Sequence, residues 1–219
     1  MSGELTGYPR IAKDNVLELI GCVQDWSNNK NNSIHHLNNV ASIKLDLISK
    51  KVINEDKDVE ERSTYSDLLQ VHSDKLCDTY EKMVALKDKM QAIAKKFQGL
   101  SASFNLERSF REGEEEDLVF DNFTWDQYVS KVTSVAKMFS EEAKVKEEIV
   151  RTVCHVDSFP GDLDYDDCKN IITTMQSSWK YEPCVNEDEL ENSIRSMLID
   201  LDLKCKTQLK DAYTLKYGY

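Results

Sequence analysis

Glycine and proline are scarce in this sequence, with 7 and 3 among 219 residues. Sandwiches and barrels need many tight turns, which these residues usually provide, so the scarcity argues against an all-β fold. No apolar run approaches the about 20 residues that a transmembrane helix requires. The first residues, MSGELTGYPRIAKD, lack a charged segment followed by an apolar one, so we expect no secretion signal and an intracellular protein.

Motifs of catalysis and metal binding are also missing. The chain has no glycine-rich phosphate loop, no GxSxG, no HExxH and no HxE with a partner CxxC. His35 and His36 are adjacent, so on a helix they point about 100° apart and do not both hold one metal ion. His155 beside Cys154 has the same defect. We therefore expect no enzyme, no cofactor and no metal.

Cysteines are present, but their spacing does not indicate disulfide pairs. The six cysteines form no CxxC and are spread along the chain: Cys22, Cys77, Cys154, Cys168, Cys184 and Cys205. Disulfides would need an oxidising compartment, which nothing else in the sequence indicates. We expect reduced, half-buried thiols.

The net charge of −12 argues against sequence-independent nucleic-acid binding, which needs a basic face. The charge is uneven, because residues 157–202 hold 12 acids and 3 bases, a balance of −9. Residues 203–219 hold four lysines and one aspartate, a balance of +3. The acidic block suits a basic partner or is a solvated surface.

Helical periodicity begins at Asp14. An apolar stripe at i, i+3, i+4 and i+7 spacing comprises Val16, Leu19, Ile20 and Val23. It resumes at Ile34 and runs to Ile48, after the low-propensity stretch SNNKNN at 27–32. The pattern predicts either one long helix or two helices broken near Asn31. A polar turn is expected at 54–61.

The clearest pattern is a heptad repeat. One apolar residue recurs every seven positions, at Leu69, Leu76, Met83, Met90, Phe97 and Phe104. Companion positions hold Leu86, Ile93 and Leu100, with His72 and Thr79 earlier in the repeat. This predicts a coiled-coil-like helix over about 62–104, which at about 1.5 Å per residue is too long for a compact globule.

Three further helices are predicted. The third long helix begins near the N-cap residue Thr124, after the acidic stretch 105–122, and stops before Pro160. Two shorter helices follow, one over about 163–179 and one starting at the cap Asn186, with Glu189 placed as in a capping box.

The predicted fold is therefore all-α, an elongated helical bundle or coiled coil of three long helices with two shorter C-terminal helices. The expected organisation is a disordered lead (1–13), a long-helix bundle (14–156, with the acidic linker 105–122), a short acidic helical module (157–203) and a basic tail (204–219).

Residues 120–202 carry a loose motif pattern. It comprises the aromatic opening FDNFTWDQYV, the helix centre KMFSEEAKVKEEIV at 137–150, and SSWKYEPCVNEDELENSIRSML at 177–198. With Asp25-Trp26, Asn38-Asn39 and the heptad helix, this order resembles the cyclin-dependent kinase 2-interacting protein (CINP) family over about 14–201.

The resemblance implies a non-enzymatic, largely nuclear adaptor. The family is linked to DNA replication, the DNA damage response, the cell cycle and ribosome biogenesis. Its implied partners are AAA+ ATPase complex subunits and cell-cycle or checkpoint kinase complexes, with neither direct nucleic-acid contact nor a membrane. The heptad helix alone equally fits an alternative, a coiled-coil subunit of a tethering, cytoskeletal or kinetochore complex.

A protein of this kind acts through exposed faces, where aromatic anchors dominate binding energy. We expect the docking surface where the chain turns from the fourth predicted helix into the fifth, or at the start of the third. The candidate partner-binding residues are Trp179, Tyr181, Pro183, Glu187, Asp188, Glu191, Trp125 and Tyr128. The alternative for Trp179 is that it belongs to the core of the bundle.

Overall fold

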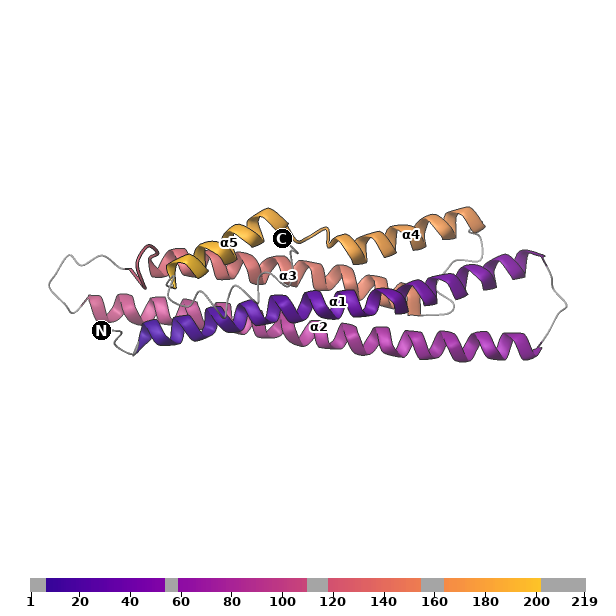
Figure 1. The fold of residues 1–219 in the computed structure, drawn as a ribbon, viewed down its shortest axis with the longest axis horizontal. Coiled ribbons are helices and arrows are strands. Elements are labelled where there is room, and N and C mark those ends of the chain that lie inside the picture. Colours follow the sequence, from indigo (N-terminus) through magenta and orange to yellow (C-terminus); the bar gives the residue numbers. More distant parts are fainter. Residues whose placement is uncertain (1–6, 54–58, 110–117, 155–163, 202–219) are drawn as a thin grey trace. The chain divides into compact units, whose positions relative to one another are not determined.

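The computed structural model of the protein describes residues 7–53, 59–109, 118–154 and 164–201. These residues form α1 (Tyr8–Ile53), α2 (Val59–Arg108), α3 (Trp125–Cys154), α4 (Tyr165–Tyr181) and α5 (Glu187–Asp200) (Figure 1). The described ranges contain no β-strand, although one isolated bridge pairs Leu118 with Thr124 just before α3. The predicted all-α class is confirmed. None of the described helices is both long and apolar enough to cross a membrane.

Helix α1 begins at Tyr8, six residues before the expected start at Asp14. The prediction of a disordered lead over 1–13 is therefore wrong for its second half, while residues 1–6 lie outside the described ranges. Pro9 falls in the first turn, where its fixed φ suits a helix and its missing N–H costs nothing. The Tyr8 ring also packs edge-on against Phe104 and Trp125, with centroids 6.4 and 6.2 Å apart.

The asparagine-rich stretch does not interrupt α1. The structure selects the single-helix alternative, because α1 continues without a break to Ile53. Side chains in and next to this stretch have long-range partners: Lys30 pairs with Glu182, and the fully buried Ser33 accepts a hydrogen bond from Trp179. Tertiary contacts of this kind outweigh the weak helix propensity of asparagine.

Helix α2 contains the heptad pattern and is longer than expected at both ends. Residues 59–61 of the predicted turn and 105–108 of the predicted linker are helical, while 54–58 and 110–117 lie outside the described ranges. The heptad residues from Leu69 to Phe97 are all buried, and Phe104 is half-buried. The seam is therefore a packing surface, while its coiled-coil geometry stays a prediction.

The chain divides into two compact units. Unit 1 comprises residues 1–25, 86–140 and 185–219, and its described part contains the start of α1, the end of α2, the start of α3 and α5. Unit 2 comprises residues 26–85 and 141–184, with the other parts of the three long helices and α4. In each unit, segments of α1, α2 and α3 pack together around a buried apolar core.

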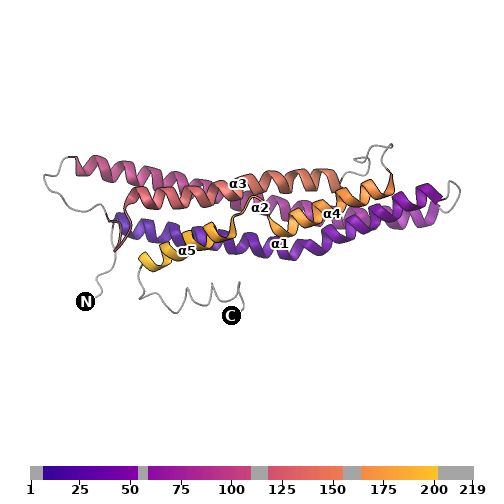
Figure 2. The same ribbon diagram turned by 90° about the horizontal axis from the view of Figure 1, so that it is seen from above.

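One short helix completes each unit. In unit 1, α5 contacts α3, where Glu189 accepts a hydrogen bond from Ser134, and Figure 2 shows α5 crossing over the first part of α1. In unit 2, α4 lies along α1, where Gln176 donates to Asn38 over 2.9 Å. The predicted acidic module 157–203 is therefore corrected: α4 and α5 are grouped with different units. The predicted basic tail 204–219 lies outside the described residues.

Local capping signals fixed several helix ends as expected. The N–H of Glu189 donates to the side chain of Asn186 at the start of α5 (3.1 Å). Thr124 precedes α3, and its hydroxyl accepts from the N–H of Gln127 over 3.4 Å. Helix α3 ends at Cys154, before Pro160 as predicted, and residues 155–163 lie outside the described ranges.

Candidate protein-interaction site

The aromatic residues that open α3 form a core in unit 1. Trp125 is buried, with the rings of Phe97 and Phe104 6.5 and 5.8 Å from its own. Tyr128 is fully buried and stacks on Phe97 at 5.8 Å, nearly coplanar. Neither ring is available to a partner, so the candidate binding role of Trp125 and Tyr128 is corrected to a core role.

The Tyr128 hydroxyl links this core to the last residue of α5. It donates a hydrogen bond to Asp200 over 2.7 Å, and the other carboxylate oxygen of Asp200 accepts from the backbone N–H of Asn122. Burial and the bond to Asp200 raise the pKa of Tyr128 far above its usual value, so the hydroxyl stays protonated and donating. The pair joins α3 to α5.

Trp179 is likewise a buried core residue, in unit 2. Its side chain is fully buried on α4, and its indole N–H donates to the hydroxyl of Ser33 on α1 over 3.2 Å. Trp179 therefore belongs to the core, the alternative that the sequence left open. Its candidate role as an exposed anchor is wrong, because its polar atom already has a partner inside the protein.

A buried ion pair lies beside Trp179. Glu142 and Lys146, one turn apart on α3, are both fully buried and 3.0 Å apart. Lys146 also donates to the Trp179 carbonyl at 2.5 Å, with its ammonium 4.8 Å from the indole centroid. Glu142 accepts from the backbone N–H of Cys184 at 3.0 Å. Burial raises the pKa of Glu142 and lowers that of Lys146, and each partner's charge opposes the shift.

A second ion pair involves Glu182, the residue that directly follows α4. Glu182 is buried and accepts from the indole N–H of Trp26 (2.6 Å) and from the ammonium of Lys30 (2.7 Å), both on α1. Its backbone is left-handed, with φ of 51°, and its N–H caps the carbonyl of Ser178. This conformation is unusual for a residue with a side chain, so the side-chain contacts offset its cost.

Together these buried groups fix the turn after α4. We call the set Glu142, Lys146, Glu182, Lys30, Trp26 and Trp179 the buried polar cluster. It bonds the end of α4 to α1 through Glu182 and to α3 through Trp179 and Cys184. Sequence reasoning missed its charged members. A signal existed, since Glu142 and Lys146 fall at helical spacing within the apolar stripe between Phe139 and Ile149.

Two of the candidate residues are exposed at this fixed turn. Tyr181, the last residue of α4, is 67% exposed, and Pro183 is also exposed. The Lys180 ammonium lies 5.1 Å from the Tyr181 ring centroid. An exposed aromatic ring on a rigid backbone loses little entropy when a partner covers it, which is the property of an interface anchor.

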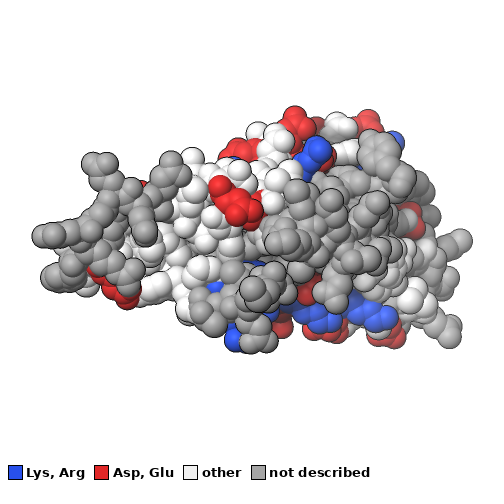
Figure 3. Space-filling model, turned by 60° about the vertical axis from the view of Figure 1, so that its left-hand side comes forward, with Lys and Arg blue, Asp and Glu red and all other residues white. Residues whose placement is uncertain are grey.

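The acidic candidates lie in unit 1, in the first turns of α5. Glu187 and Asp188 are exposed and Glu191 is half-buried. Carboxylates here interact favourably with the N-terminal end of the helix dipole, which explains them without a partner. On the face drawn in Figure 3, acidic and basic side chains both appear, so the described residues there present no uniform charge.

The described residues also bear on the metal and thiol chemistry considered from the sequence. No three His, Cys, Asp or Glu side chains among them are arranged to hold a metal ion. Five cysteines are described and all are free thiols, of which Cys77 and Cys154 approach to 3.9 Å between sulfur atoms. Cys205 lies outside the described ranges.

Comparison with known protein families finds none that matches the chain. Comparison with curated proteins finds no matching sequence.

Proposed function

We propose that this protein is a non-enzymatic adaptor that binds other proteins through the end of α4. The observation that carries the proposal is Tyr181, a 67% exposed aromatic ring at a turn whose backbone the buried polar cluster holds in place. Such a cluster contributes little net stability to a fold, because burying charges costs several kcal/mol per ion. Its use at this turn is consistent with a need for one defined geometry there.

The partner class follows from the resemblance to the CINP family. On that basis the partners are subunits of an AAA+ ATPase complex and cell-cycle or checkpoint kinase complexes, in the nucleus. The roles would be genome maintenance and ribosome biogenesis. The all-α fold is compatible with this proposal, since the family resemblance implies a helical adaptor. The acidic first turns of α5 would serve as a second contact that steers a basic partner.

The test is affinity capture of the full chain from cells, with quantitative mass spectrometry of what binds. We expect an AAA+ ATPase among the enriched proteins, and we expect Tyr181→Ala to remove it. The matched control is Tyr165→Ala, which removes a 37% exposed tyrosine from the other end of α4. Capture that is equal for wild type and Tyr181→Ala would disprove the role of this ring.

The acidic contact needs its own variant. Glu187, Asp188 and Glu191 changed together to Lys should weaken capture and reduce its salt dependence. The control reverses the same number of exposed charges elsewhere in unit 1, at Asp14, Asp25 and Asp121. Equal capture by both triple variants would show that the acidic turn is only a solvated surface.

One observation favours the alternative of a coiled-coil subunit in a tethering, cytoskeletal or kinetochore complex. Leu68 and Val71, one turn apart on α2, are 46% and 48% exposed next to the buried seam. A partner helix would bury both. The same capture experiment separates the two functions, because enrichment of vesicle or kinetochore proteins that depends on Leu68 and Val71 would support the alternative.

A further inference from the structure

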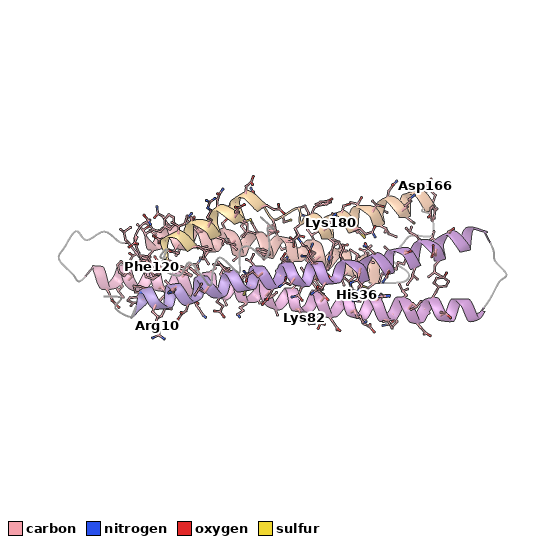
Figure 4. All side chains as sticks on the ribbon, viewed as in Figure 1. Arg10, His36, Lys82, Phe120, Asp166 and Lys180 are labelled. Carbon is pink, nitrogen blue, oxygen red and sulfur yellow. The ribbon has the colours of Figure 1, made fainter. Side chains whose placement is uncertain are left out.

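Two histidines from different helices meet in unit 2. His36 on α1 and His72 on α2 are both half-buried, and their Nδ1 atoms lie 2.9 Å apart. Figure 4 labels His36 on the part of α1 that runs alongside α2. At this distance one ring donates its Nδ1–H to the bare Nδ1 of the other, so the pair is held together by a single shared proton.

The outer nitrogen of His72 also has a partner. The side-chain amide of Asn39, one turn after His36 on α1, lies 3.3 Å from His72 Nε2. The amide can donate through its NH₂ or, when turned over, accept through its oxygen. In the second orientation it holds the proton of His72 on Nε2 and leaves Nδ1 bare. Metal-binding histidines almost always have such a partner on the outer nitrogen.

We propose that His36 and His72 bind one divalent first-row transition-metal ion, of the nickel or cobalt class, through their Nδ1 atoms. Metal–imidazole bonds are about 2.0–2.1 Å long. Two such bonds at a right angle, as at neighbouring positions of an octahedral ion, place the nitrogens about 2.9 Å apart. The observed separation matches this distance, but the ring centroids lie 5.2 Å apart, which places the two Nδ1 atoms nearly in line, so both rings must turn before their lone pairs face one ion.

Binding changes the position of one proton. The proton shared between the two Nδ1 atoms moves to the outer nitrogen of the ring that carried it, through water, and both Nδ1 lone pairs then face the metal.

The remaining coordination positions go to water. Among the described residues no third His, Cys, Asp or Glu completes the site, and the half-burial of both rings leaves room for solvent. The exposed His35 ring packs against the His36 ring, with centroids 3.6 Å apart, and we do not count it among the ligands. Two protein ligands predict weaker binding than at a structural zinc site.

The experiment is calorimetric titration of the full, metal-stripped chain with Ni²⁺, which does not oxidise thiols. We expect one ion to bind per chain, and we expect His36→Gln and His72→Gln each to remove the binding. Asn39→Ala should weaken it about tenfold, the lower end of the range for outer-nitrogen partners. Saturating Ni²⁺ should raise the melting temperature of the wild type but not of His72→Gln.

Matched controls separate this site from other ligands. His35→Gln and His155→Gln should bind as the wild type does, and so should the double variant Cys77→Ser, Cys154→Ser. Circular dichroism of each variant establishes that the helices are intact. The proposal is overturned if the wild type takes up no ion, if His36→Gln and His72→Gln still bind, or if the cysteine variant loses the binding.

Discussion

The fully buried ion pair of unit 2 gives the sharpest prediction. Replacing Lys146 by Met keeps the length of the side chain but removes the ammonium that faces Glu142 at 3.0 Å. Glu142 is then left as a buried carboxylate whose remaining described bond comes from the Cys184 N–H. Removing one partner of a buried pair costs about 3–5 kcal/mol, so we expect Lys146→Met to lose that much of the free energy of unfolding.

A second substitution should restore much of this loss. In Lys146→Met, Glu142→Leu no charge remains buried, and replacing a buried pair by apolar residues is neutral or stabilising by about 1–4 kcal/mol. Against this, the Cys184 N–H and the Trp179 carbonyl lose their partners, at about 1–3 kcal/mol for each group that stays unsatisfied. We therefore expect the double variant to be more stable than the single one, and close to or somewhat below the wild type.

The loss in Lys146→Met should also depend on pH. Burial already raises the pKa of Glu142, and removing the nearby cation raises it further. Because the folded pKa then lies above the unfolded one, the ionised carboxylate destabilises the fold at neutral pH. That penalty is relieved as pH falls through the folded pKa. The difference from the wild type should therefore be smaller at pH 5 than at pH 7.5.

Urea unfolding followed by circular dichroism measures all three quantities. The control is Lys144→Met, which breaks an exposed pair with Glu141 on the same helix and should cost at most about 1 kcal/mol. If Lys146→Met is as stable as Lys144→Met, or if its loss does not change with pH, then Glu142 and Lys146 do not form a buried charged pair.

Four other predictions concern the core and the thiols. Met90→Asp places a carboxylate in the fully buried heptad seam and should cost several kcal/mol, and an unchanged melting curve would show that the seam is not packed. Tyr128→Phe removes the hydroxyl that donates to Asp200 and should cost about 1–3 kcal/mol in urea unfolding, whereas a neutral result would mean that this bond adds nothing. All six cysteines should react with a thiol reagent after denaturation without reductant, and protected pairs would contradict the free thiols described. In the native protein Cys154 should be alkylated slowly at pH 8, because burial and the neighbouring Cys77 raise its pKa to about 12, and rapid labelling would contradict this assignment.

The long helices followed from sequence because their signal is local and repeated. The seam from Leu69 to Phe97 is buried throughout, as a seven-residue period predicts. The caps at Thr124 and Asn186 were equally readable, since a cap depends on residues three positions apart. The predicted elongated shape depends on how the two units sit relative to each other, and it stays a prediction.

The errors arose where distant residues decide the outcome. Tyr8 is helical partly because Phe104 and Trp125 pack on it, and no window around Tyr8 contains those rings. The grouping of α4 and α5 with different units likewise depends on long-range contacts, such as Trp179 with Ser33 and Tyr128 with Asp200. An acidic composition shared by the two helices says nothing about these contacts.

The candidate interaction residues divide in the same way. The sequence by itself determined that Trp125, Tyr128, Trp179 and Tyr181 are aromatic residues at helix ends, because periodicity and capping fix where helices begin and stop. Only the tertiary structure decided which of these rings are buried. Tyr181 is exposed while Trp179, two residues earlier, is fully buried, because the two side chains leave α4 about 200° apart and only one direction meets α1 and α3.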